Sequence, residues 1–425
     1  MNLLKHHHIT IKKIRLVIRS SYHKISSNLK YIHQNISKTE NDLIIEYFLK
    51  ILKKINLLKS FSNLFSDKLN PKIISFGSMN GNMFIDNPMH LFLYIKNQDT
   101  DFNCFWFTRS RKVFQELSNK GYAVIYHYSL RAIKVLKASK FLITGWSVNS
   151  DFLPIKFSKQ TNIIQTWHGS QFKKVLNDTG RPFKEVLEYS NQYYMISPGK
   201  NITPFINSAF QVQLSHIFVT GLPRNDYLFN SSDYLIQDLR QKYHIPKNIE
   251  RIILYAPTYR KTNYTATFPL SIEEKNKLNL WLEQNNTVLL CKSHFANKIE
   301  IFGESKNIYR IDKYTQTQEL ILISDVLITD YSTLFFDFIL IDKPVILFPY
   351  DYKEYLINPG IYFDLEEIAV GPVAYTNDHL LSAITSMGDW MGQYVDPINN
   401  IRNKYWDYVD GNACERFLDI LTSHF

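Results

Sequence analysis

The clearest chemical signal in this sequence is a hydroxyl-rich turn, TDYST at residues 329–333, between two apolar segments. Residues 326–328 form a short β-branched run that predicts a buried strand, and residues 334–341 are apolar on nearly every face, which predicts a buried helix. Ser332 and Thr333 then fall at the N-terminus of that helix, where free backbone N–H groups and the helix dipole favour an anion. The turn therefore predicts a phosphate site, although the same residue types also form ordinary helix N-caps.

A histidine follows a second apolar strand. Residues 162–166 predict the strand, and His168 and Gly169 come just after it. Gly169 lets the backbone turn sharply, so the histidine can project from the C-terminal edge of the strand, where ligands sit in open α/β sheets. Lys173 and Lys174 follow and are close enough to help neutralise an anionic substrate. A lone histidine after a strand is more often structural, so its chemistry depends on the surrounding motifs.

Four further motifs accompany these two: IFVTGLPRND at residues 217–226, RIILYAPTYR at 251–260, LLCKSHF at 289–295 and PYDYKEYLINPGIYFD at 349–364. In this order, the six segments resemble the CDP-glycerol glycerophosphotransferase family, whose members polymerise or prime teichoic-acid-like polyol phosphate chains. The resemblance covers roughly residues 70–390.

Two positions depart from the family pattern. Phe295 stands where the family usually has a proline, which alters the backbone beside His294. Thr333 stands where the family has a second serine, and this change keeps a hydroxyl group.

The resemblance implies a phosphoryl transfer in which an acceptor hydroxyl attacks the glycerol-side phosphorus of CDP-glycerol and CMP leaves. It makes His168 the general base, and His294, from the second half, the group that stabilises phosphate charge or protonates CMP. Such transfers need positioning and charge neutralisation more than covalent help, so neither a cofactor nor a metal is expected. The substrate contacts are expected from Gly169, Lys173, Arg224, Asn225, Thr258, Arg260, Thr329, Asp330, Ser332, Thr333 and Asp337.

Some of these roles have alternatives. Arg224 and Arg260 are expected to neutralise the diphosphate, although either could form an ordinary ion pair between domains. Asp337, one turn into the predicted helix, is expected to hold a polyol or ribose hydroxyl. For the whole chain, three other functions stay open: a transferase using CDP-ribitol, a glycosyltransferase using a nucleotide sugar, and a membrane-surface scaffold without activity.

Length and composition fit a cytoplasmic enzyme. A chain of 425 residues exceeds what one core normally serves, and a hydrophobic content of 45% suffices for two. Three widely spaced cysteines form neither a disulfide framework nor a CxxC metal pair, which favours a reducing compartment. The sequence has neither 18 uninterrupted apolar residues nor a signal-peptide pattern, so no transmembrane helix is expected.

The positive charge is concentrated at one end. Residues 1–60 contain 12 Lys and Arg against three acids, a net charge of +9, together with apolar stripes at helical spacing around residues 14–18 and 44–55. Basic amphipathic helices bind anionic membrane surfaces, so we expect a peripheral enzyme on the inner face of the cell membrane, facing a lipid-linked or polymer acceptor. The alternative is a helical pair packed on the main body. Nucleic acid is not an expected partner, because the rest of the chain is nearly neutral.

From residue 70 onward, predicted strands and helices alternate, which indicates parallel sheets covered by helices. They form two series, separated by a polar linker at residues 231–248, and a final helix around residues 401–422 is expected to return to the first half. We therefore predict an α/β chain of two Rossmann-like domains facing across a cleft, the GT-B fold, with a basic helical N-terminal extension. The expected domains are residues 1–65 (extension), 66–235 (acceptor side), 236–395 (CDP-polyol side) and 396–425 (returning helix).

Overall fold

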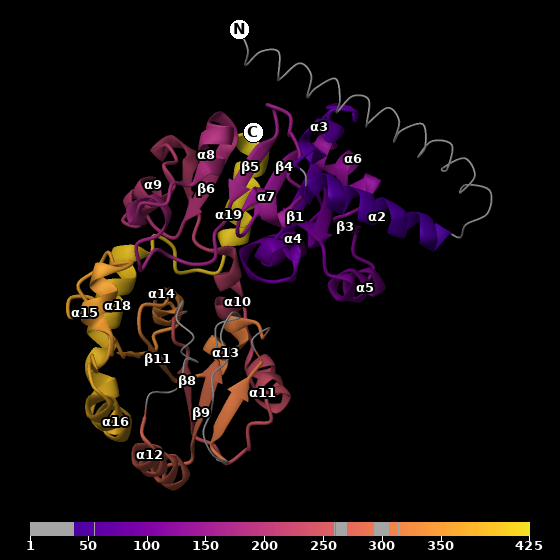
Figure 1. Ribbon diagram of the computed structural model, residues 1–425. Coiled ribbons are helices and arrows are strands. Elements are labelled where there is room, and N and C mark those ends of the chain that lie inside the picture. Colours follow the sequence, from indigo (N-terminus) through magenta and orange to yellow (C-terminus); the bar gives the residue numbers. More distant parts are fainter. Residues whose placement is uncertain (1–37, 55, 259, 261–269, 293–305, 313–314) are drawn as a thin grey trace, which may run out of the picture.

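The computed structural model describes residues 38–54, 56–258, 260, 270–292, 306–312 and 315–425. Strands and helices alternate along them and form two stacked lobes, each built on a parallel sheet (Figure 1). The predicted α/β class with two Rossmann-like lobes is confirmed.

The first lobe contains a seven-stranded sheet in the order β3-β2-β1-β4-β5-β6-β7, and every neighbouring pair is parallel. Because parallel strands need crossover connections, helices cover both faces, and the middle of each strand is largely apolar. The strands are β1 (Asn70–Gly77), β2 (Asn103–Thr108), β3 (Val124–Tyr126), β4 (Ser139–Thr144), β5 (Asn162–Gln165), β6 (Tyr193–Ser197) and β7 (Ile217–Val219). The helices are α4 (Asp86–Asn97), α5 (Arg111–Asn119), α6 (Leu130–Ala138), α7 (Val148–Asp151), α8 (Lys184–Tyr189) and α9 (Thr203–Phe210).

The second lobe contains a five-stranded parallel sheet in the order β10-β9-β8-β11-β12. Its strands are β8 (Arg251–Tyr255), β9 (Thr287–Lys292), β10 (Ile308–Ile311), β11 (Val326–Thr329) and β12 (Val345–Leu347). The helices are α12 (Ile272–Gln284), α13 (Thr317–Ile323), α14 (Leu334–Ile339), α15 (Tyr352–Ile357), α16 (Asn377–Thr385) and α17 (Met387–Trp390).

The connection between the lobes is more ordered than the predicted linker. It contains α10 (Asp226–Phe229) and α11 (Asp233–Lys242), and α11 contacts α13 of the second lobe. Lys242 donates to Glu319 over 2.5 Å, and Tyr243 donates to the same carboxylate. The polar composition of this segment therefore belongs to a surface helix rather than to a free linker.

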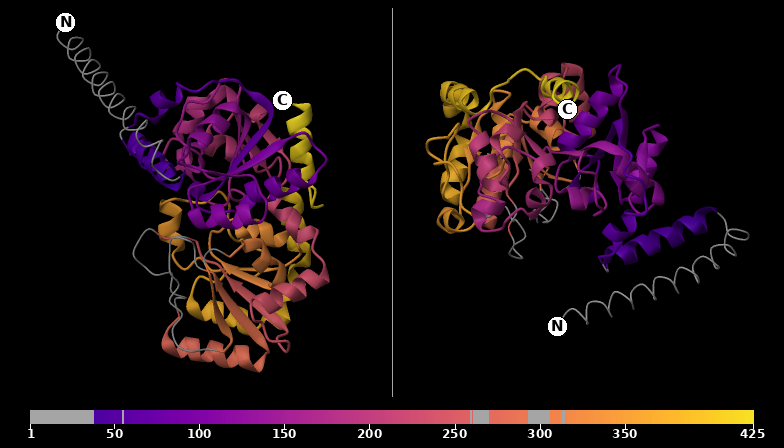
Figure 2. Two further views of the ribbon diagram at one scale, coloured as in Figure 1. Left: turned by 90° about the vertical axis from the view of Figure 1, so that its right-hand side faces the viewer. Right: turned by 90° about the horizontal axis from the view of Figure 1, so that it is seen from above.

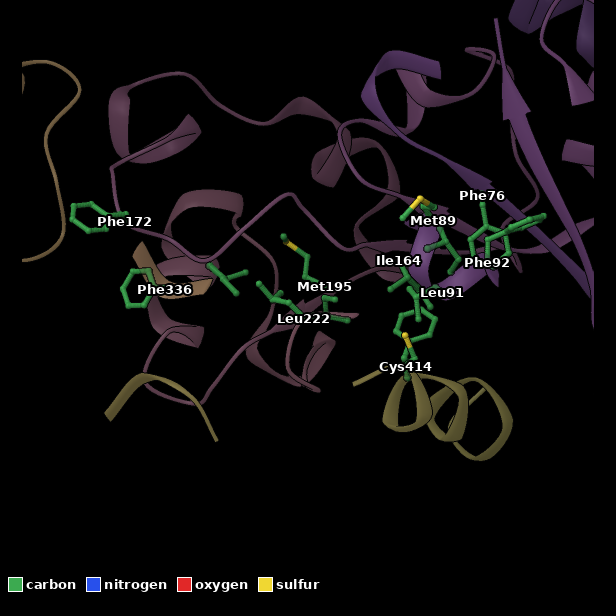
Figure 3. Packing of buried hydrophobic residues seen from close by; sticks show 14 of the residues in the cluster. Phe76, Met89, Leu91, Phe92, Ile164, Phe172, Met195, Leu222, Phe336 and Cys414 are labelled. Carbon is green, nitrogen blue, oxygen red and sulfur yellow. The ribbon is translucent and has the colours of Figure 1, made fainter. Parts of the chain in front are cut away.

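The C-terminal segment also differs from the prediction of one helix. It forms α18 (Val395–Tyr405) and α19 (Ala413–Ser423), separated by a loop that contains Gly411 at φ 69°. The first contacts α14 in the second lobe, and the second contacts α4 in the first lobe. The expected return to the first lobe is thus made by α19, whose Cys414 points into the first-lobe core (Figure 3).

Helix α2 (Lys38–Lys54) and the short α3 (Leu58–Ser62) pack on the outside of the first lobe (Figure 2). Leu49 is fully buried, and Glu46 accepts hydrogen bonds from Lys50, Arg111 and Tyr126. One face of α2, which is part of the predicted basic extension, is therefore packed against the first lobe. Residues 1–37, with the first predicted apolar stripe, lie outside the described residues.

One apolar cluster joins the two lobes. It extends from the first sheet to one face of the second sheet, while a second cluster fills the other face of the second sheet. Phe172 of the first lobe contacts Phe336 of α14, with ring centroids 6.0 Å apart (Figure 3). This shared core fixes the position of one lobe relative to the other, so that the C-terminal ends of strands in both sheets face one cleft. In the described parts of the chain, no helix is both long and apolar enough to cross a membrane.

Candidate active site

The loops at the C-terminal strand ends of both lobes line a cleft of about 230 Å³. Of the predicted site residues, six lie on its lining: His168, Lys173, Arg224, Thr258, Ser332 and Thr333. The other described ones, Gly169, Asn225, Arg260, Thr329, Asp330 and Asp337, are not among the lining residues and support those that are.

The loop after β5 brings His168 into the cleft. Trp167 has a left-handed backbone at φ 53°, and Gly169 at φ 149° continues the sharp turn. The imidazole packs against two indole rings, with centroids 4.6 Å from Trp146 and 4.0 Å from Trp167. These ring contacts fix the orientation of the histidine at the mouth of the first lobe.

The same loop touches the hydroxyl-rich turn of the other lobe. A Cβ atom on Gly169 would lie 2.4 Å from Thr333 Oγ1, so only glycine allows this approach. The segment that follows is also tied to the second lobe: Lys174 N donates to Gly360 O over 3.0 Å, and Tyr362 N donates to Phe172 O over 3.1 Å. The two motifs singled out in the sequence therefore meet across the cleft.

Arg224 lies in the seam between the lobes and is almost fully buried. Its guanidinium pairs with Asp337 of α14 and with Asp86 Oδ1 at 3.1 Å, and it donates to His168 O over 2.8 Å. Burial alone would lower the pKa of Arg224, but Asp337 and Asp86 outweigh burial and raise it. Arg224 therefore forms the interdomain ion pair that the sequence analysis gave as the alternative to a diphosphate contact. Its hydrogen bond to His168 O positions the backbone of that histidine.

Asp337 is fully buried under this arginine. Besides the ion pair, its Oδ1 accepts a hydrogen bond from Asn225 Nδ2 over 2.8 Å, and burial raises its pKa. It therefore faces Arg224 and Asn225 rather than a ligand hydroxyl in the cleft. The first turn of α14 points toward the first lobe, which the helical pattern could not indicate.

Arg260 and Asp330 form a second ion pair within the second lobe. Asp330 accepts from Thr258 N at 2.8 Å, Thr258 Oγ1 at 2.5 Å and Arg260 Nη2 at 2.7 Å, while Arg260 Nε donates to Asp351 Oδ2 over 2.8 Å. Asp330 and Asp351 raise the pKa of Arg260 against the opposing effect of burial. This arginine also lies over the ring of Tyr355, 4.9 Å from its centroid. The network fixes Thr258 and the turn that carries Ser332.

The 329–333 turn does not provide a side-chain N-cap to the helix that follows it. Helix α14 is only six residues long, and Thr333 makes no side-chain cap to it. Ser332 Oγ accepts weakly from Leu334 N at 3.3 Å, whereas Thr329 is buried and donates to Ala256 O over 2.6 Å. Ser332 and Thr333 both line the cleft, so their hydroxyls face the space where a ligand would bind.

Two lysines face this space from opposite lobes. Burial lowers the pKa of Lys173 to about 8, as does the charge of Arg260, while Asp330 opposes the shift. Burial also lowers the pKa of Lys292, to about 8, and its Nζ donates to Thr315 O over 2.9 Å. Among the residues that the structure describes, no carboxylate lies within ion-pair distance of either ammonium group. An anion bound here would therefore stabilise both charges.

Sequence reasoning missed several lining residues, notably Lys292, Asp86, Met79, Met83 and Trp146. Trp146 follows β4, and β4 pairs with β5, so the strand-end rule that found His168 would also have found Trp146. His294 falls outside the described residues, and its predicted role stays a prediction.

Comparison with known proteins assigns the chain to a family. The model of the CDP-Glycerol:Poly(glycerophosphate) glycerophosphotransferase family matches residues 56–423. The chain is 31% identical to a teichoic acid poly(glycerol phosphate) polymerase of Bacillus spizizenii over 74% of this chain and 83% of the relative. It is 28% identical to the Bacillus subtilis polymerase over 88% of this chain, and spans 52% of that relative's length.

Ribitol-phosphate enzymes are also similar: TarL of Staphylococcus aureus is 28% identical over 63% of this chain and 50% of the relative. Among solved structures, the wall teichoic acid polymerase TagF superposes with a TM-score of 0.74 over 90% of this chain and 97% of the other, at 24% identity, and confirms the GT-B-like fold. Because the family model covers most of the sequence, this chain belongs to the CDP-glycerol:poly(glycerophosphate) glycerophosphotransferase family.

Proposed function

We propose that this protein transfers glycerol phosphate from CDP-glycerol to a hydroxyl of a polyol-phosphate or glycan acceptor and releases CMP. The observation that carries the proposal is the meeting of His168 with the hydroxyls of Ser332 and Thr333 in one cleft that also holds Lys173 and Lys292. The family membership and a TagF structure obtained after a soak with CDPG support the same donor.

In the proposed reaction, the acceptor oxygen bonds to the glycerol-side phosphorus while the bond from that phosphorus to the CMP oxygen breaks. His168 takes the proton of the acceptor hydroxyl as general base. Lys173, Lys292 and the turn at Ser332 and Thr333 neutralise and orient the diphosphate, which is the main requirement of phosphoryl transfer. His294 is proposed to stabilise the charge on phosphate or to protonate the departing CMP.

Arg224 and Arg260 were expected to contact the diphosphate, and we propose an indirect role for both instead. Arg224 acts through Asp86, Asp337 and the carbonyl of His168, and Arg260 acts through Asp330 and Asp351. Arg224 positions His168, and Arg260 positions Thr258 through Asp330. The charge of each arginine is already neutralised by carboxylates, so the two lysines are the better partners for a diphosphate.

The decisive experiment measures CMP release from CDP-glycerol and from CDP-ribitol, with and without candidate acceptors. Acceptor-dependent CMP release, with the polyol and its phosphate both found in the product, supports the proposal. Faster turnover of CDP-ribitol would reassign the donor. Transfer of a sugar without phosphate from a nucleotide sugar would identify a glycosyltransferase instead, and the absence of any CMP release would favour a scaffold.

We also propose that α2 helps to hold the enzyme on an anionic membrane surface at the inner face of the cell membrane, where a lipid-linked acceptor would be found. The face of α2 opposite the buried Leu49 exposes Leu43, Ile44, Tyr47 and Ile51. Lys53 and Lys54 close the same helix, and such a combination of apolar and basic side chains suits a headgroup layer.

This surface is tested by replacing Leu43, Ile44, Tyr47 and Ile51 with serine and measuring co-sedimentation with anionic and neutral vesicles. Binding should fall with the replacements and with rising salt, because salt screens the attraction over about 10 Å. Replacing the exposed Ile272 and Leu280 of α12 with serine is the matched control. Binding that ignores lipid charge, or that survives the α2 changes, would contradict the proposal.

A further inference from the structure

The loop that presents His168 depends on one strained residue. Trp167, directly before the histidine, has a left-handed backbone at φ 53°, a conformation that a bulky residue rarely adopts. Strain of this kind persists only where the surroundings enforce it, and it gathers at functional sites. The direction in which the imidazole leaves the strand end is therefore set by the groups that hold this stretch of backbone.

A buried asparagine holds the backbone from one side. Asn87, the second residue of α4, is fully buried, and its Nδ2 donates to two consecutive carbonyls, Thr166 O over 3.2 Å and Trp167 O over 3.1 Å. Its Oδ1 accepts from Arg224 N over 3.0 Å. Among neutral side chains, only a primary amide combines two such donors with an acceptor. With the hydrogen bond from Arg224 to His168 O, three carbonyls in a row are bound on this side.

A glutamine holds the same turn from the other side. Gln165 Oε1 accepts from Trp167 N over 2.9 Å, and its Nε2 donates to Trp146 O over 2.9 Å. Gln165 therefore links the two residues whose indole rings pack against His168. Asn87 has the complementary task, because it fixes the whole loop relative to α4.

The start of α4 is itself fixed by contacts outside the histidine loop. Met79 at φ 49°, Asn80 at φ 57° and Asp86 at φ 66° are left-handed in the loop that leads into the helix. The buried Asp151 supports this loop by accepting from Asn80 N over 2.8 Å. Asp86 Oδ1 then accepts from Asn87 N over 2.9 Å. The amide of Asn87 is thus in place before the histidine loop packs against it.

We propose that Asn87 is a positioning residue for the proposed reaction, which orients His168 through the carbonyls of Thr166 and Trp167 and does not touch the substrates. This inference rests on the proposed function, in which His168 is the general base. Asn87 is fully buried and is not among the residues that line the cleft. Replacing it should therefore displace the base and leave the donor site intact. A displacement of about 1 Å can lower a rate about 10²-fold.

The test is a double-mutant cycle on kcat. Asn87→Ala should lower kcat at least about tenfold, but by less than His168→Ala, and should leave Kd for CDP-glycerol within about twofold. In a protein that already carries His168→Ala, adding Asn87→Ala should change kcat by no more than about twofold, because residues that act through one group are not additive. The inference is overturned if Asn87→Ala lowers kcat by the same factor whether or not His168 is present.

Two further variants separate positioning from folding. Asn307 is the matched control, because its Nδ2 also donates to two carbonyls, Leu282 O over 3.4 Å and Thr287 O over 2.8 Å, at the strand end away from the cleft. Asn307→Ala should lose stability and keep its kcat, and a loss of kcat equal to that of Asn87→Ala would contradict the inference. If Asn87→Ala fails to fold, Asn87→Asp takes its place. It keeps the size and the acceptor for Arg224 N, but turns an oxygen toward the two carbonyls.

The NMR signal of the His168 ring gives a readout that does not depend on turnover. Because the imidazole packs against the indoles of Trp146 and Trp167, their ring currents displace its C–H resonances, which His168→Ala identifies in protein made with isotope-labelled histidine. Asn87→Ala should move these resonances toward those of an exposed histidine, and Asn307→Ala should leave them in place. If no variant releases CMP, the proposed function fails, but this movement would still show that Asn87 orients the histidine. Resonances that keep their position in Asn87→Ala would refute the inference.

Discussion

The two walls of the cleft are held in place by different physical means. On the first-lobe side, Asp151 accepts four hydrogen bonds from neutral donors and supports a strained loop. On the second-lobe side, Asp330 binds Thr258 and the cation of Arg260, which in turn binds Asp351. Both carboxylates are buried, and within the described part of the chain only Asp330 has a charged partner.

This difference shows two ways of stabilising a buried carboxylate beside a cleft. Asp151 is surrounded by neutral donors, so hydrogen bonds alone stabilise its negative charge. Asp330 and Asp351 share the cation of Arg260, so hydrogen bonds and charge pairing act together on the second-lobe side. The loops on the two sides of the cleft should therefore respond differently when a carboxylate is neutralised.

The largest expected effect is a difference in stability when each of the two buried carboxylates is neutralised. Asp330→Asn should lower the free energy of unfolding by about 3–5 kcal/mol, because it leaves the buried Arg260 with one of its two carboxylates. Asp151→Asn, the matched change, should cost only about 1–3 kcal/mol, the range for one hydrogen bond left unmade. Denaturant unfolding of the two variants measures both values. Equal costs would mean that charge pairing does not distinguish the two walls.

The next largest effect is a loss of turnover when His168, in the cleft between the lobes, is replaced. His168→Ala should reduce kcat by about 10² or more, the usual contribution of a positioned base. Binding of CDP-glycerol, followed by calorimetry, should hardly change, since the donor phosphates are held by Lys173, Lys292 and the turn at Ser332 and Thr333 rather than by the imidazole. Near-normal turnover would remove His168 from the mechanism.

A smaller effect is expected at the second wall itself. Replacing Ser332 and Thr333 together with alanine should weaken CDP-glycerol binding by about 1–3 kcal/mol, the range for hydrogen bonds to charged groups. Cytidine is the control, because it lacks phosphate and should keep its affinity. An equal loss for cytidine would show that the turn had collapsed or that it holds the nucleoside.

The smallest effect is a pH dependence of donor binding. Lys173 and Lys292 have pKa values lowered to about 8, so in the free protein both are charged below pH 8 and lose their charge as the pH rises through it. CDP-glycerol affinity should therefore fall above pH 8 by about fivefold per lysine, from about 1 kcal/mol for one charge pair in a water-filled cleft. Titration calorimetry at pH 7 and pH 9 measures this. A Lys173→Gln, Lys292→Gln double variant that keeps the same pH dependence would contradict it.

The strands and the two motifs that meet in the cleft could be predicted because each depends on local pattern. The strand predicted at residues 326–328 is β11 (Val326–Thr329), because a short β-branched apolar run between turns is typical of a buried strand. Likewise, the strand-end rule placed His168 at the C-terminal edge of its sheet, and the predicted helix N-terminus identified the 329–333 turn as an anion site.

The remaining features depend on partners that are distant in sequence. Trp146 and His168 follow neighbouring strands, but their rings stack because Trp167 has a left-handed backbone, which the apolar pattern of the strand does not indicate. Asp337 is turned toward Arg224 by the packing of the lobes, so its distance from the cleft could not be predicted from its own helix. The break between α18 and α19 falls at Gly411, within a segment whose apolar spacing still suits one helix.

The return of α19 to the first lobe has a consequence for how the chain acquires its structure during synthesis. Cys414, Phe417 and Leu421 are buried in the shared core, on the side where α19 contacts α4 of the first lobe. Asp226 accepts hydrogen bonds from Ala413 N at 2.9 Å and Cys414 N at 2.7 Å and so holds the start of this helix. Until residues 413–423 leave the ribosome, that side of α4 stays uncovered while the whole second lobe is translated. Exchanging lobes between family members therefore requires moving α19 together with the first lobe, although the sequence separates them by an entire sheet.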